Sequence, residues 1–165
     1  MKRFPILKSA DIYHIFNRGI SKNKIFTDEI SYRFFLLKLA VYRKKYAIKL
    51  IAFCVMPSHF HVLIYTKEKA NNIPKFMQSI QHSYSLFFNH RNNHSGHVFQ
   101  GTYNNKNIHP FDTNNVISYI LQNPVKEKFV KRAEDWPYSG VYMPGIHGAN
   151  ICTKQMPSFP ITKKN

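Results

Sequence analysis

Acidic residues are scarce in this sequence. Its 8 Asp and Glu stand against 24 Lys and Arg, which gives a formal net charge of +16 at pH 7 and an isoelectric point near 9.9. Such an excess says little about the fold, but it favours a partner that carries many negative charges. Nucleic acid is the first candidate for that partner, and an anionic membrane surface is the second.

Cysteines and long apolar runs are scarce too. Cys54 and Cys152 lie far apart, and Cys54 falls in an apolar stretch where we expect a buried thiol, so no oxidising compartment is implied. The first ten residues, MKRFPILKSA, lack the apolar core of a signal peptide, and no run approaches a membrane span. We therefore expect a cytoplasmic protein that has no membrane as its partner.

The chain also lacks an internal repeat. Its 165 residues, 44% of them apolar, fit one globular domain that can bury its own core. From about residue 143 onward Pro, Gly, Lys and Asn dominate, a composition typical of a flexible tail. We therefore expect a domain over residues 1–142 and a flexible C-terminal tail over 143–165.

Periodicity predicts an α+β fold. The predicted strands are 11–17, 48–55, 59–66 and 98–108, and the predicted helices are 28–45, 73–88 and 113–122. The first six elements follow the order β-α-β-β-α-β, which is the split βαβ arrangement of ferredoxin-like folds. We therefore expect an antiparallel sheet with helices on one face, followed by a further, C-terminal helix.

Local patterns refine the predicted helices. Thr27 is the predicted N-cap of the first helix, and Pro124 is expected to stop the last one. The buried stripe of the first helix is predicted to consist of Ile30, Phe34, Leu37 and Val41. That of the second helix is predicted to consist of Ile73, Phe76, Met77, Ile80, Tyr84 and Phe87.

Two histidines stand at the start of the predicted strand 59–66. His59 and His61 are two residues apart, so on a strand they point to the same face, where neutral imidazoles can bind one cation. A polar pair at a strand end is the alternative, and two ligands alone are too few. Because the cysteines offer no zinc-type spacing, the oxygen-preferring ions Mg²⁺ and Mn²⁺ are favoured.

A second pair of residues lies on the predicted last helix. Tyr119 and Asn123 are one helical turn apart and share a face. A phenol and a carboxamide at this spacing can offer a nucleophile and a hard oxygen ligand to the same cation. The alternative is a half-buried helix aromatic and a C-terminal cap ahead of Pro124, and the residues alone leave both open.

Taken together, the motifs resemble a known family. MPSHFHVLIY is followed about sixty residues later by YILQNPVK, and YHIFNRG, GHVFQG and WPYS accompany them. The set is similar to the HUH single-tyrosine transposases (His, hydrophobic residue, His), and within them to the REP-associated tyrosine transposases of the IS200-like group. The resemblance covers roughly residues 8–142.

The resemblance implies a role for each of these residues. His59 and His61 are implied to bind Mg²⁺ or Mn²⁺, and Tyr119 is implied to be the nucleophile. Asn123 takes the third-ligand position, where the insertion-sequence branch tends to have Gln, so the adjacent Gln122 is an alternative. Of the other tyrosines, Tyr84 is expected in the core, and Tyr103 is expected on the fourth strand, where it can stack on a base.

The implied activity is that of a metal-dependent, single-stranded DNA transposase or nickase. A phenol of pKa about 10 is a weak nucleophile that needs a cationic surround, and a divalent ion neutralises charge on the phosphodiester. Attack by Tyr119 yields a 5′-phosphotyrosine and a free 3′-OH, which allows rejoining without ATP. The implied substrates are hairpin ends of insertion or REP-type elements.

Aromatic residues, 15% of the chain, are interleaved with cations, as suits single-stranded nucleic acid. The candidate phosphate contacts are Arg18, Arg33, Arg43, Lys44, Lys45 and Arg91, with Tyr103 as a candidate base contact. The alternatives are a non-catalytic binding module of the RNA-recognition type and a degenerate transposase that binds hairpins without cleaving them. Whether the protein acts as a monomer or a homodimer is left open.

Overall fold

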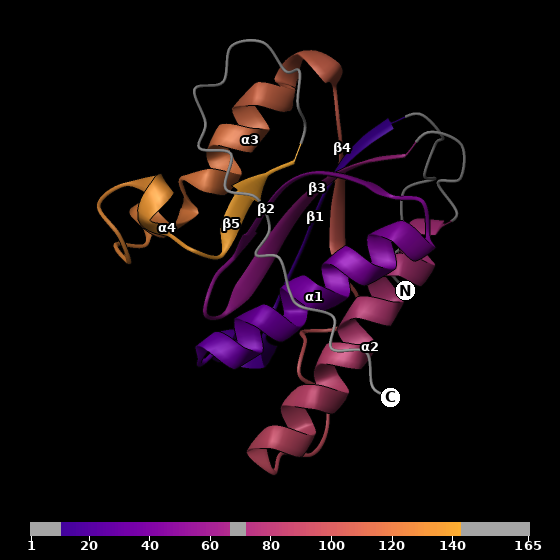
Figure 1. The fold of residues 1–165 in the computed structure, drawn as a ribbon, viewed down its shortest axis with the longest axis vertical. Helices are drawn as coiled ribbons and strands as arrows, with labels where there is room; N and C mark the ends of the chain where they lie inside the picture. The colour runs from indigo at the N-terminus through magenta and orange to yellow at the C-terminus, as the bar shows by residue number, and fades with distance from the viewer. Residues whose placement is uncertain (1–10, 67–71, 143–165) are drawn as a thin grey trace, which may run out of the picture.

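The computed structural model describes residues 11–66 and 72–142 (Figure 1). Five antiparallel strands form one sheet in the order β4-β1-β3-β2-β5. The strands are β1 (Asp11–Arg18), β2 (Lys49–Val55), β3 (His59–Thr66), β4 (Asn104–Ile108) and β5 (Ser139–Val141). The α-helices are α1 (Glu29–Lys45), α2 (Asn72–Asn92), α3 (Thr113–Leu121) and the short α4 (Asn123–Lys126).

The topology confirms the predicted ferredoxin-like α+β fold. Chain order β1-α1-β2-β3-α2-β4 combines with the spatial order β4-β1-β3-β2, which is the split βαβ arrangement. Helices α1 and α2 cover one face of the sheet, and α3 lies on the opposite face (Figure 1). The fifth strand, β5, was not predicted; it pairs with β2 through only three residues.

Strands β1 and β3 contribute alternate residues to the two faces of the sheet. Tyr13 and Ile15 of β1, with Phe60 and Val62 of β3, belong to the core beneath α1 and α2. On the other face, Leu63 belongs to a smaller apolar cluster with residues of α3. The members of this smaller cluster are Ile51, Ala52, Cys54, Met56, Leu63, Ile117, Ile120 and Leu121.

The start of α1 differs from the prediction by one residue. Asp28, not Thr27, is the N-cap: its side chain accepts from the Ser31 backbone N–H at 2.8 Å, and the Ser31 hydroxyl accepts from the Asp28 N–H at 3.2 Å. Such a reciprocal pair satisfies two donors that the helix itself leaves unpaired. A carboxylate with a partner three residues later therefore displaces Thr27 from the cap.

The predicted buried stripe of α1 was also wrong. The buried side chains are Ser31, Tyr32, Phe35, Leu36 and Leu39. Ile30 and Val41 remain 53% and 48% exposed. Because apolar residues occupy most of this helix, two adjacent stripes carry similar hydrophobicity, and packing against α2 and the sheet selects between them.

Helix α2 buries five of its six predicted core residues, with Phe87 only partly buried, and it extends beyond residue 88 to Asn92. The predicted strand 98–108 is shortened to β4. Residues 98–103 form irregular backbone in which Gly101 adopts a left-handed conformation (φ 71°), and Val98 and Phe99 pack into the core. Tyr103 therefore precedes the fourth strand instead of lying on it.

Cys54 is a buried free thiol, as expected. Within the described ranges, no helix combines the length and hydrophobicity needed to cross a membrane. Cys152 and the predicted tail, 143–165, lie outside the described residues.

Candidate active site

The two histidines of β3 lie on the sheet face that α3 covers. His61 pairs with Phe16 of β1 on one side and Cys54 of β2 on the other, and His59 pairs with Arg18. Their ring centroids are 5.1 Å apart, with the ring planes at 87°. The intervening Phe60 points into the core on the opposite face. The shared orientation predicted from the His-x-His spacing is therefore present.

Hydrogen bonds orient both imidazoles. Nδ1 of His61 lies 2.9 Å from Nε2 of His14, and Nδ1 of His59 lies 3.1 Å from the Ser58 hydroxyl. With both Nδ1 atoms engaged, Nε2 is the nitrogen that each ring presents to a ligand. Nε2 of His59 is 3.6 Å from Oε1 of Glu127.

Burial keeps these histidines neutral. It lowers the pKa of His61 to about 3, with smaller contributions from His14 and His59. It also lowers the pKa of His14 to about 4, assisted by Lys106. The pKa of His59 is lowered chiefly by burial, although Glu127 opposes that shift. Neutral imidazole is the form that binds metal ions, so the site suits a cation at neutral pH.

Tyr119 comes from α3 and reaches the same place. Its ring centroid is 5.8 Å from that of His61 and 6.0 Å from that of His14, in edge-on contacts. The residue is 45% exposed, and the ammonium of Lys126 lies 4.5 Å from the ring centroid. An accessible phenol thus stands beside the histidine pair with a cation against its ring.

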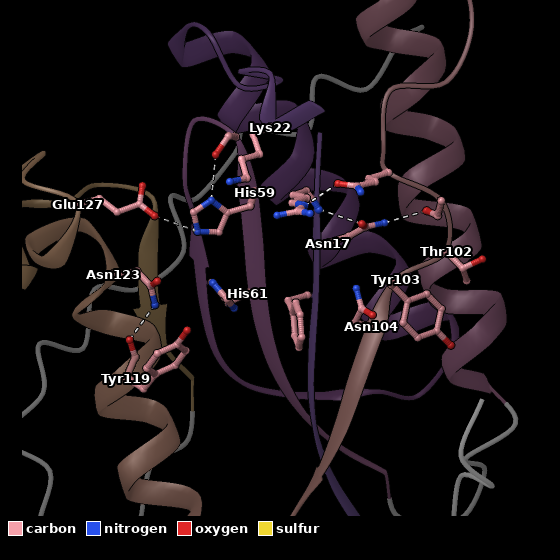
Figure 2. Close-up of a pocket in the computed structure, with 15 residues that line it drawn as sticks. Asn17, Lys22, His59, His61, Thr102, Tyr103, Asn104, Tyr119, Asn123 and Glu127 are labelled. Atoms are coloured by element: carbon pink, nitrogen blue, oxygen red, sulfur yellow. Dashed lines mark hydrogen bonds and ion pairs between the residues drawn. The ribbon is translucent and has the colours of Figure 1, made fainter. Parts of the chain in front are cut away.

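Asn123, the first residue of α4, is almost fully buried beside Tyr119. Its Nδ2 donates to the backbone carbonyls of Tyr119 at 2.8 Å and Ile120 at 3.2 Å. This orientation leaves Oδ1 as the ligand atom that the amide offers, and Figure 2 shows Asn123 opposite His61. Gln122, the alternative third ligand, is exposed and does not line the cleft.

A cleft of about 1030 Å³ joins these groups (Figure 2). Of the predicted site residues, it brings together His59, His61, Tyr119, Asn123, Arg18 and Tyr103. Nε of Arg18 donates to the Gln100 side chain at 2.6 Å. Tyr103 is only 6% exposed, and burial raises its pKa to about 12, so its ring offers little surface to a base.

The other predicted phosphate contacts do not line the cleft. Arg33, Arg43, Lys44, Lys45 and Arg91 lie on α1 and α2, across the sheet from α3 (Figure 1). Arg33 pairs with Glu29 and Arg91 with Asp28. The guanidinium of Arg43 stacks on Tyr142 at 4.6 Å. Their contact with DNA stays a prediction.

Tyr84, the other suspected nucleophile, is fully buried in the core. Its hydroxyl donates to the Ile25 carbonyl at 2.6 Å, and burial raises its pKa well above the usual value. A buried phenol bonded in this way cannot meet a DNA strand. The expectation that Tyr84 is a core residue is confirmed.

Two residues of the site escaped the sequence analysis, His14 and Glu127. His14 stands in the YHIFNRG motif and is pointed at His61 by the pairing of β1 with β3. Glu127 lies four residues beyond Asn123, at the end of α4. The helical spacing of Glu127 was available from the sequence, whereas the contact of His14 depends on strand register.

The donor set fits a divalent cation. Two neutral imidazoles and an amide oxygen meet in the cleft, and carboxylate and amide oxygens suit Mg²⁺ and Mn²⁺. Over residues 11–66 and 72–142, no three His, Cys, Asp or Glu side chains form a compact metal-binding cluster by themselves. The amide of Asn123 is therefore needed to complete a three-ligand set with His59 and His61.

Comparison with known proteins places the chain. The family model described as "Transposase IS200 like" matches residues 8–123. No curated protein matches. Among solved structures, the fold is similar to a REP-associated tyrosine transposase bound to a REP hairpin, with a TM-score of 0.70 and 18% identity over 84% of this chain and 81% of that chain. It is also similar to a putative transposase from Deinococcus radiodurans R1, with a TM-score of 0.51 and 17% identity over 73% of this chain and 95% of that chain.

At such identities the solved structures show a shared fold. The family match rests on the sequence itself and spans the strand with both histidines, the helix with Tyr119 and, at its last position, Asn123. With well over half of its 165 residues matched, the chain belongs to the IS200-like transposase family.

Proposed function

We propose that this chain is a metal-dependent transposase that nicks and rejoins single-stranded DNA through Tyr119. The observation that carries the proposal is the position of the Tyr119 ring, 5.8 Å from His61 of the same chain, at one cleft. A half-exposed phenol next to a metal-ligand pair suits nucleophilic attack on a phosphodiester.

His59, His61 and Asn123 would hold the cation, Mg²⁺ or Mn²⁺. When bound, such an ion neutralises charge on the phosphodiester and orients it. The protein contributes the orientation of its ligands: the bonds of Ser58 and His14 to the Nδ1 atoms direct Nε2 of both rings, and the backbone carbonyls fix the Asn123 amide. Ligands held in this way lose little freedom when the ion binds.

In the cleavage step, the Tyr119 oxygen forms a bond to phosphorus and the bond from phosphorus to the 3′ oxygen breaks. The phenol loses its proton, the released 3′ oxygen gains one, and the downstream strand stays attached as a 5′-phosphotyrosine. A 3′-OH that attacks this phosphotyrosine reverses the step and joins the strands. Lys126, 4.5 Å from the ring centroid, places positive charge beside the nucleophile.

The proposed substrate is single-stranded DNA with hairpin ends. Support comes from the net charge of +16, from Arg18 at the cleft and from the similar transposase whose structure contains a REP hairpin. Because phosphate contacts dominate such binding, affinity should fall steeply as salt rises.

The test uses end-labelled, hairpin-bearing single-stranded oligonucleotides with Mn²⁺, resolved on denaturing gels. We expect a covalent adduct with the wild-type protein, none with Tyr119→Phe and none in the presence of a chelator. Tyr103→Phe is the control, because it also removes one phenol from a residue of the cleft. An adduct that persists in Tyr119→Phe would overturn the assignment, and tight binding that ignores the chelator and gives no cleavage would favour a non-catalytic binding module.

A further inference from the structure

Glu127 is an acid in a cleft meant for DNA. Among the described residues it is the only acidic side chain that lines this cleft. The chain has just 8 acidic residues, and three of the others are paired with arginines: Asp28 with Arg91, Glu29 with Arg33 and Glu134 with Arg132. Glu127 instead faces His59.

A carboxylate at this position opposes the binding of phosphate. DNA brings negative charge into the cleft, and two like charges a few ångströms apart repel unless a cation lies between them. Lys126 does not supply that cation, since its ammonium lies over the Tyr119 ring. A metal ion held by Glu127 itself would turn the repulsion into attraction.

The distances suit a bridging ion. Oε1 of Glu127 lies 3.6 Å from Nε2 of His59, beyond the usual range of a hydrogen bond of about 2.7–3.2 Å. Two ligand atoms bound to the same ion at about 2.1 Å are separated by about 3.0–3.4 Å, depending on its geometry. A small approach of the partly exposed Glu127 side chain therefore brings both atoms to one ion.

The backbone supports the same placement. Glu127 follows Asn123 by four residues, and its N–H donates to the Asn123 carbonyl at 2.9 Å, so one helical turn relates the two side chains. Figure 2 shows Glu127 and Asn123 on one side of the cleft, with His59 and His61 facing them. The four side chains thus surround one space.

We propose that Glu127 is a fourth ligand of the divalent ion, beside His59, His61 and Asn123. The proposal rests on the proposed metal-dependent function and deepens it. With a carboxylate in the set, the protein binds Mn²⁺ or Mg²⁺ before DNA arrives, and the oxygen donors equal the imidazoles in number, which favours these ions over zinc.

The experiment measures Mn²⁺ binding to the DNA-free protein, by titration calorimetry and by the electron paramagnetic resonance signal of free Mn²⁺. Glu127→Gln keeps the size of the side chain and removes its charge. Glu134→Gln is the matched control, because it removes the same charge from an acid outside the cleft. His61→Ala removes an assigned ligand.

We expect Glu127→Gln to weaken Mn²⁺ binding by at least about tenfold, Glu134→Gln to leave it within about twofold, and His61→Ala to abolish it. If Glu127→Gln binds like the wild type while His61→Ala does not bind, Glu127 is not a ligand and the metal site stands. If His61→Ala also binds like the wild type, or if the wild type binds no Mn²⁺, the assigned metal site fails, and Glu127 with it.

Discussion

The sheet face under α1 and α2 and the sheet face under α3 receive alternate residues of the same strands. The first face is filled with packed rings, such as Phe35 against Phe60 at 4.9 Å and Phe26 against Tyr84 at 4.7 Å. The second is apolar around Leu63 but polar around His14 and His61.

The difference between these faces teaches how a small domain holds a reactive site in place. Neighbouring residues of one strand are separated by the sheet, so Phe60 can anchor β3 while His61 meets the cleft. The ligands then inherit the rigidity of the core, as a preorganised site requires. Three variants at or next to these positions test this division of labour.

The largest effect on stability is expected on the core face. Phe60→Ala should lower the free energy of unfolding by about 3–5 kcal/mol, because it leaves a cavity among packed rings. His61→Ala, one residue later, should cost about 1–3 kcal/mol, mainly by leaving His14 without its partner. Urea unfolding followed by circular dichroism measures both. Equal losses for the two variants would contradict the separation of core and site.

The second effect is a pH dependence of stability that belongs to the cleft face. The unfolded chain takes up protons on both rings as the pH falls below about 6.5. The folded protein resists this until about pH 4 at His14 and about pH 3 at His61, because of burial. The contribution is therefore fully present above pH 6.5, and it is lost as the pH falls, by about 1.4 kcal/mol per pH unit for each histidine.

Urea unfolding at pH 7, 6 and 5 checks this slope. His14→Phe should flatten the profile, because it removes one of the two buried titrating rings. Phe60→Ala should shift the whole profile downward without changing its slope, since the described core beneath α1 and α2 contains no histidine. A profile of wild-type steepness in His14→Phe would show that the pH dependence arises elsewhere.

How far the sequence predicts these faces depends on how local the information is. Strand 59–66 and its histidines were predicted because alternation of period two is written in consecutive residues. The stripe of α1 was misassigned because Ile30 and Val41 are as apolar as the residues actually buried, and only tertiary packing selects among them. Strand β5 is three residues long, too short to show any period.

The same reasoning separates the site residues. Tyr119 and Asn123 were found together because helical spacing relates them, and the resemblance to a family added their roles. Glu127 was missed because Pro124 was taken as a stop, whereas Pro is accepted in the first turn of a helix and opens α4 here. His14 was missed because its contact with His61, 47 positions away in sequence, depends on how β1 registers against β3.

The smallest expected effect concerns this contact and is measured as metal affinity. His14 touches no assigned ligand atom of the cation; it holds Nδ1 of His61 at 2.9 Å and so directs Nε2 towards the cleft. Partners of this kind typically contribute 10–100-fold to metal affinity. His14→Phe keeps a ring against Phe16 and Tyr119 but removes the hydrogen bond, so Mn²⁺ binding should weaken by about that factor. His14→Gln, which retains a polar group able to meet Nδ1, should recover part of the loss. Tyr13→Phe is the matched control, because Tyr13 adjoins His14 but points into the opposite core, and its affinity for Mn²⁺ should equal that of the wild type. Unchanged binding in His14→Phe would mean that the strands alone orient His61, and that the two faces differ in chemistry but not in how they are held.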